Sequence, residues 1–165
     1  MAKQDILVVG IVVFSLLLAF FIIRVVFSKY LSVSVPKNQV AYSDASGIDF
    51  SDLKKISAKP LLLGFESKFI SDEELYFDAQ YLYAVDQQKG IAKFKLDNIS
   101  RLTRTSTQVN NHTVWQLDIE QSEKVVIFKF THNYSIWNTN FKVFYDKLKE
   151  INPSVVKSNW SLWKM

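Results

Sequence analysis

The spacing of apolar residues divides the chain into three patterns, and the first is an almost unbroken apolar run. Residues 6–27 are interrupted only by Gly10, Ser15 and Arg24. A helix of that length is roughly 33 Å long, enough to cross a hydrocarbon core about 30 Å thick. We therefore predict a short tail over 1–5 and a membrane-spanning helix over 6–27. Residues expected inside the bilayer are Ile6, Phe14, Leu18, Ile23 and Phe27.

Two other interpretations of this run fit less well. A cleaved signal peptide has a shorter apolar region and a small-residue cleavage site, which residues 27–31 do not offer. A helix buried in a core is rarely apolar on all sides over such a length. Arg24 lies near the end of the run and Lys29 follows it, and such positive charges favour the cytoplasmic side. The predicted location is a single-pass membrane protein with its C-terminal domain in the cytoplasm.

Residues 28–59 have the mixed, turn-rich composition of a connector. Asp49 or Ser51 is expected to cap a short helix that carries Leu53 and Ile56 on its apolar side. The lysines of this segment either attract anionic lipid headgroups or form a solvated helix face. The two tryptophans of the tail over 154–165 suit either a membrane interface or docking on the domain. The predicted membrane-surface contacts are Arg24, Lys29, Lys54, Lys55, Trp160 and Trp163.

The second pattern begins near Pro60 and has the period of two that is typical of β-strands. Its clearest example starts at Leu75, where Asp78 to Gln80 are expected to divide two strands. Trp115, Leu117 and Ile119 are predicted to face the apolar residues of 126–130 across a hairpin. The strands are expected within residues 61–65, 75–85, 92–96, 99–105, 115–119 and 126–130.

The third pattern has helical spacing and predicts one amphipathic helix over about 134–151. Asn133 or Ser135 is expected to cap its start, and Pro153 ends it. Its apolar stripe is expected to pack in the core rather than to form a groove for a partner. The residues predicted in the core are Trp137, Phe141, Phe144 and Leu148. We expect six or seven antiparallel strands over 60–153, forming a small β-barrel that this C-terminal helix closes.

The region 75–153 resembles a pleckstrin-homology-like domain of the bacterial or GRAM type. The resemblance rests on an LY-containing hairpin, a strand in the place of the family's I-P-L-x-x-I strand, a W-x-L-x-I strand, a K-x-x-x-F-x-F strand and the helix. These features lie at residues 82–85, 91–99, 115–119, 124–130 and 144–148. The resemblance implies a barrel of antiparallel strands capped by a helix, here carried on an N-terminal transmembrane anchor. It says more about fold than about function.

Composition and charge exclude several functional classes. The 165 residues carry a net charge of +4 with basic and acidic residues intermixed, so nucleic-acid binding is not expected. Cysteine is absent, which excludes disulfides and thiolate metal sites. The two histidines, His112 and His132, have no neighbouring acid in sequence and are expected to be ordinary solvated residues. With no nucleophile elbow, P-loop or dinucleotide fingerprint, we expect no enzyme, cofactor or metal site.

Partner binding is the function that remains. The leading hypothesis is a non-enzymatic membrane protein that presents its domain to a protein partner or serves as a subunit of a membrane assembly. A lipid-surface binding module and a small immunity or inhibitor protein are the alternatives. Specific phosphoinositide binding is not expected, because the loop that would carry basic residues has Asp72, Glu73 and Glu74.

Overall fold

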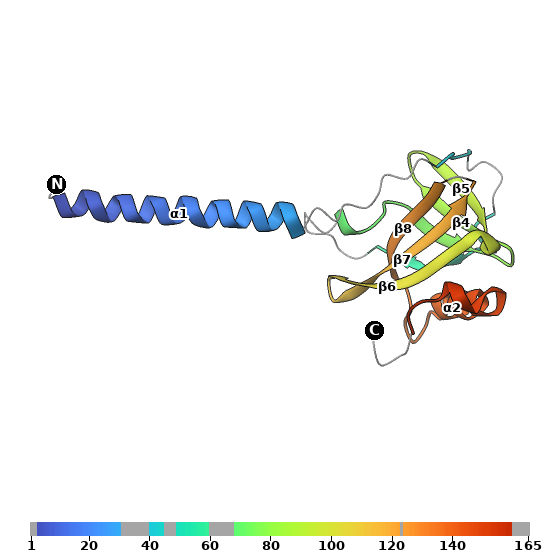
Figure 1. Ribbon diagram of the computed structural model, residues 1–165. Coiled ribbons are helices and arrows are strands. Elements are labelled where there is room, and N and C mark those ends of the chain that lie inside the picture. Colours follow the sequence, from blue (N-terminus) through green and yellow to red (C-terminus); the bar gives the residue numbers. More distant parts are fainter. Residues whose placement is uncertain (1–2, 31–39, 45–48, 60–67, 123, 160–165) are drawn as a thin grey trace. The chain divides into compact units, whose positions relative to one another are not determined.

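The computed structural model describes residues 3–30, 40–44, 49–59, 68–122 and 124–159. The chain divides into two compact units, Met1–Ser34 and Val35–Met165. Figure 1 shows a single helix in the first unit, whereas the strands and the remaining helices belong to the second. The predicted strand over 61–65 and both tryptophans of the tail, Trp160 and Trp163, lie outside the described residues.

The first unit contains helix α1, Lys3–Tyr30. Within it, side chains are described at Val8, Val25 and positions 10–22, and they are exposed. A helix needs about 20 consecutive apolar residues to cross a bilayer. Among the described residues, no helix is both long enough and apolar enough to do so. This finding overturns the predicted spanning segment over 6–27 and the single-pass membrane location. The affected residues are Ile6, Phe14, Leu18, Ile23 and Phe27.

The second unit is mainly β, with two antiparallel sheets of four strands each in its described part. Strand order is β1-β3-β4-β5 in the first sheet and β2-β8-β7-β6 in the second. The first sheet contains β1 (Lys54–Lys55), β3 (Glu74–Phe77), β4 (Tyr81–Asp86) and β5 (Gly90–Lys95). The second contains β2 (Ser57–Ala58), β6 (Ile99–Val109), β7 (His112–Gln121) and β8 (Lys124–His132). Helix α2 (Asn140–Ile151) and the short helices η2 (Leu96–Asn98) and η3 (Pro153–Val155) also belong to the described part of this unit.

The β7–β8 hairpin has the register that the alternation predicts. Trp115 pairs with Phe130, Leu117 with Phe128, and Ile119 with Val126. All six side chains are buried. Because alternate residues of a strand point to opposite faces, this register places the six on one side of the sheet.

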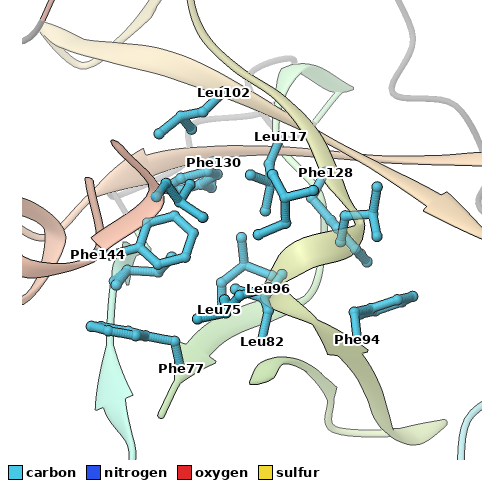
Figure 2. Packing of buried hydrophobic residues seen from close by; sticks show 14 of the residues in the cluster. Leu75, Phe77, Leu82, Phe94, Leu96, Leu102, Leu117, Phe128, Phe130 and Phe144 are labelled. Atoms are coloured by element: carbon cyan, nitrogen blue, oxygen red, sulfur yellow. The ribbon is translucent and has the colours of Figure 1, made fainter. Parts of the chain in front are cut away.

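The two sheets and α2 share one apolar core. Figure 2 shows side chains from both sheets and from the helix pointing into it, with Phe144 between Phe77 and Phe130 in this view. The rings of Phe77 and Phe144 meet edge to face with their centroids 5.2 Å apart. Phe94 of the first sheet meets Phe128 of the second in the same way, at 5.8 Å. Aromatic contacts of this kind join all three layers.

The predicted closed barrel is wrong, because the outer strands of the two sheets do not pair in the described part of the chain. The free edge of β5 is occupied by Ser43, whose N–H and C=O both hydrogen-bond Ile91 at 2.9 Å. The free edge of β6 is occupied by a parallel bridge between Leu102 and Val156. Segments that flank the sheets therefore cover the edges that a barrel would join.

On the opposite side, the sheets are connected by the segment 54–58, where a short helix was predicted. This prediction is wrong, since Lys54–Lys55 is strand β1 and Ser57–Ala58 is strand β2. Between them, Ile56 donates its N–H to the C=O of Leu75 in the first sheet and accepts the N–H of Asn133 after the second. The segment is therefore part of both sheets, one after the other, because β3 and β8 supply its strand partners.

Helix α2 is shorter than predicted, beginning at Asn140 rather than near residue 134. Phe141, Phe144 and Leu148 are almost fully buried, as their spacing predicts. The prediction that Trp137 lies in the core is wrong, because this side chain is 94% exposed. Residues 135–138 close a tight turn before the helix begins, so the helical spacing of the stripe does not extend to Trp137.

Gly90 is required where Ser43 approaches strand β5. Its φ of +104° is one that residues with a side chain rarely adopt, and a Cβ atom there would lie 2.2 Å from the carbonyl oxygen of Ser43. We expect Gly90→Ala to lower the free energy of unfolding by about 1–3 kcal/mol and to expose the amide of Ile91 to exchange. Urea denaturation and amide hydrogen exchange measure both effects. Gly10→Ala, for which the space around the Cβ is open, is the matched control; equal results for the two variants would contradict this account.

Candidate protein-binding turn

Two large apolar side chains project from the second unit next to each other. Ile136 is 88% exposed and Trp137 is 94% exposed. They are the two central residues of the turn 135–138, which connects β8 to α2 and is called the Trp137 turn below. Single exposed apolar residues are common on protein surfaces, but an adjacent pair with this exposure is the kind of feature that marks an interaction site.

The Trp137 turn is closed by hydrogen bonds between its two ends. The N–H of Ser135 donates to the C=O of Asn138 at 2.9 Å, and the N–H of Asn138 donates to the C=O of Ser135 at 3.2 Å. The hydroxyl of Ser135 also accepts the N–H of Asn138, and the side-chain oxygen of Asn138 accepts the N–H of Asn140. Ser and Asn favour turns because their side chains form such local hydrogen bonds. The polar ends thus fix the conformation in which Ile136 and Trp137 are presented.

Two asparagines attach the Trp137 turn to the first sheet. The side-chain amide of Asn133 donates to the C=O of Lys55 at 2.7 Å, and that of Asn140 donates to the same oxygen at 3.1 Å. One asparagine precedes the turn and the other follows it, so both ends are held at a single point of β1. An apolar pair held in this way loses little conformational freedom when it binds.

His132 supports the turn from the core side. Its ring stacks on that of Phe141, with centroids 4.8 Å apart, and its Nδ1 accepts the N–H of Tyr134 at 3.2 Å. Burial, together with the charges of His112 and Arg104, lowers the pKa of His132 to about 4. The ring is therefore neutral at pH 7 and accepts this hydrogen bond. The prediction of an ordinary solvated histidine is wrong for His132.

Of the two lysines of β1 predicted to contact a membrane surface, one is free to face solvent and the other is paired with a carboxylate. Lys54 is exposed, whereas the ammonium of Lys55 lies 2.8 Å from the carboxylate of Glu74. Burial alone would raise the pKa of Glu74, but hydrogen bonds from Lys55, Tyr76 and Lys59 lower it to about 2. Lys55 is thus engaged within the protein. The side chains of Arg24 and Lys29 are outside the described residues.

A cavity of about 400 Å³ lies at the other end of α2. The turn between β3 and β4, the short helix η2 and the last turn of α2 surround it. Tyr81, Leu96 and Ile151 are among the residues that line it, together with four charged residues. The charged residues are Lys95, Asp97, Lys147 and Glu150. In the described part of the chain, none of these four forms an ion pair within 4.0 Å.

Comparison with known proteins adds no family: no model of a protein family and no curated protein matches the chain. The resemblance to pleckstrin-homology-like domains consequently stays a prediction. Among the described residues, no group of three or more His, Asp or Glu side chains could hold a metal ion.

Sequence reasoning missed the presentation of Ile136 and Trp137, although a signal was present. Ser135 and Asn138 flank the pair, and residues of these two types at both ends of an apolar dipeptide are typical of a turn. The cavity could not be found from sequence, because its lining comes from three segments that are distant in the chain.

Proposed function

We propose that the second unit is a protein-binding module, without catalytic activity, and that the Trp137 turn is its contact with a partner. The observation that supports this most strongly is the exposure of Trp137 at the tip of a turn whose two ends are hydrogen-bonded to each other and whose flanking asparagines are hydrogen-bonded to β1. Tryptophan is enriched among the residues that contribute most to protein interfaces. A large aromatic side chain also contributes contact area at a small cost in conformational entropy, since it has only two rotatable bonds.

A lipid surface is a less favoured partner for the Trp137 turn than a protein. Anionic headgroups attract clusters of several basic residues, with about 1 kcal/mol from each near the surface. Of the two adjacent lysines in β1, Lys55 is engaged with Glu74, which leaves Lys54. The geometry favours a partner protein with an apolar pocket that receives Trp137.

Replacing both apolar residues of the Trp137 turn with serine tests this proposal. Because the two side chains are exposed, Ile136→Ser with Trp137→Ser should change the free energy of unfolding by less than about 0.5 kcal/mol. The same variant should bind a partner roughly 30-fold more weakly. Tagged full-length chain is used for capture, and the affinity is then measured with the purified captured protein.

The control is Val125→Ser, which removes another exposed apolar side chain, on β8. Binding that both Val125→Ser and the wild type retain, and that the turn variant loses, supports the proposal. Equal binding by all three proteins would refute it. The same three proteins are also mixed with vesicles of anionic phospholipid. If vesicle binding requires Ile136 and Trp137 but protein capture does not, the Trp137 turn contacts a lipid surface and not a protein partner.

A further inference from the structure

The cavity at the end of α2 has walls that hydrogen bonds and packing hold in place. In the turn between β3 and β4, the carboxylate of Asp78 accepts the N–H groups of Gln80 and Tyr81, each at 2.7 Å. The C=O of Gln80 accepts the N–H of Leu96 at 2.9 Å, which ties this turn to the start of η2. Leu96 and Leu148 of α2 are both buried in the main apolar core, so η2 and the helix are held together. A cavity with walls fixed in this way needs little rearrangement to accept a ligand.

Two lysines and two carboxylates line this cavity, and each of two walls supplies one charge of each sign. Lys95 and Asp97 lie at the end of β5 and in η2, whereas Lys147 and Glu150 lie in the last turns of α2. Among the described residues, none of the four has an ion-pair partner within 4.0 Å. The lining therefore has no net charge, but it presents both signs of charge to the same space.

The spacing of the charges on α2 does not by itself prevent them from pairing. Lys147 and Glu150 are three positions apart, a separation at which opposite charges on a helix can meet. Lys142 and Asp146, earlier in the same helix, do pair, with 2.6 Å between the ammonium and the carboxylate. The two charged groups at the cavity instead stay available to a ligand.

Charge complementarity selects the class of ligand that fits. A small anion would be attracted by the two lysines but repelled by the two carboxylates, and a small cation would meet the reverse. A molecule with an ammonium at one end and a carboxylate at the other can face both signs at once. The amide of Gln80 and the phenol of Tyr81 add hydrogen-bonding groups to the lining. The volume of about 400 Å³ is near the lower end of the range for ligand pockets, which suits a molecule of dipeptide size.

We propose that this cavity binds a small zwitterion of the size of a free dipeptide, with its ammonium toward the two carboxylates and its carboxylate toward the two lysines. This inference goes beyond the proposed function and does not depend on the Trp137 turn, which lies before the other end of α2. Hydrogen bonds between charged groups are stronger than neutral ones, so both ends of the ligand contribute to the affinity.

Three forms of one dipeptide test the role of each charge. L-alanyl-L-alanine carries both charges, its N-acetylated form lacks the ammonium, and its C-terminal amide lacks the carboxylate. Titrated into the isotope-labelled full-length chain, L-alanyl-L-alanine should shift the amide NMR signals of Tyr81, Lys95 and Asp97 with a Kd of about 1 mM or below. Each blocked form should bind at least about tenfold more weakly. Equal binding of L-alanyl-L-alanine and either blocked form would overturn the proposal, as would the absence of saturable shifts up to about 10 mM.

Glutamine substitutions in α2 test the location of the site. Lys147→Gln with Glu150→Gln removes one charge of each sign, preserves the net charge and keeps residues that favour a helix. This variant should bind L-alanyl-L-alanine at least about tenfold more weakly than the wild type, with an unchanged unfolding midpoint in urea. The matched control, Lys142→Gln with Asp146→Asn, removes an ion pair elsewhere on α2 and should bind as the wild type does. Equal affinities of these two variants would overturn the assignment to the cavity. The serine variant of the Trp137 turn should also bind the dipeptide normally, so the two proposals can fail separately.

Discussion

Replacing Phe141 with alanine is expected to lower the free energy of unfolding of the second unit by about 3–5 kcal/mol. The side chain is fully buried, and its ring lies 5.2 Å from that of Trp115, 6.1 Å from that of Phe130 and 4.8 Å from that of His132. Removing it forfeits these contacts and leaves a cavity between α2 and the second sheet. Urea denaturation followed by circular dichroism measures the change.

The neighbouring substitution Lys142→Ala is the control for this prediction. Lys142 is exposed and pairs with Asp146 one helical turn away, and an exposed pair of this kind contributes little to stability. Its loss should leave the unfolding transition nearly unchanged. A similar, small effect of both substitutions would mean that α2 does not pack on the sheet through Phe141.

Lowering the pH from about 6.5 to about 4 is expected to reduce the stability of the second unit by about 3 kcal/mol through His132 alone. The pKa of this histidine is lowered to about 4 in the folded protein, chiefly by burial. Between these two values the unfolded chain binds a proton that the folded chain does not, so stability falls as the pH falls. Protonation also removes the acceptor for the N–H of Tyr134, because Nδ1 then carries a hydrogen.

His132→Asn isolates this contribution, because asparagine keeps an acceptor for Tyr134 but does not titrate. The variant should lose less stability than the wild type between pH 6.5 and 4, in urea titrations at several pH values. Below about pH 4.5 both proteins lose the contribution of Glu74, whose pKa is lowered to about 2. His112→Asn removes one of the charges that lower the pKa of His132, so this variant should lose less stability than the wild type and more than His132→Asn. The same pH dependence in His132→Asn and the wild type would contradict this assignment.

The parts of the fold that depend on local alternation could be predicted from the sequence. The β7–β8 hairpin has the expected pairs, such as Leu117 with Phe128, because a period of two specifies which face is buried. The division of residues 75–85 into β3 and β4 also follows from local turn chemistry, as the carboxylate of Asp78 accepts the N–H groups of Gln80 and Tyr81. In such segments, neighbouring residues determine the structure.

Two of the predictions that failed concern features that depend on distant segments. The segment that carries Leu53 and Ile56 was predicted as a short helix, but β3 and β8 supply strand partners that the local pattern does not reveal. The prediction of a closed barrel did not anticipate that Ser43 would cover the edge of β5. Trp137 has the helical spacing of a core residue, yet hydrogen bonds between Ser135 and Asn138 keep it outside the helix. The candidate site therefore arises where local turn hydrogen bonds, not distant contacts, override the periodic pattern.

The segment 54–58, which forms the corner between the two sheets, affects the order in which the protein folds during synthesis. The carbonyl oxygen of Lys55 accepts hydrogen bonds from residues 78 and 85 positions later, and β2 pairs with β8. A ribosome must therefore release residue 140 before this corner can form, although the corner lies early in the unit. Contacts that span so much chain are slow to close. Until then the apolar side chains of the strands stay exposed to solvent. The last segment that the ribosome must supply for these hydrogen bonds, residues 133–140, is the one that carries Trp137.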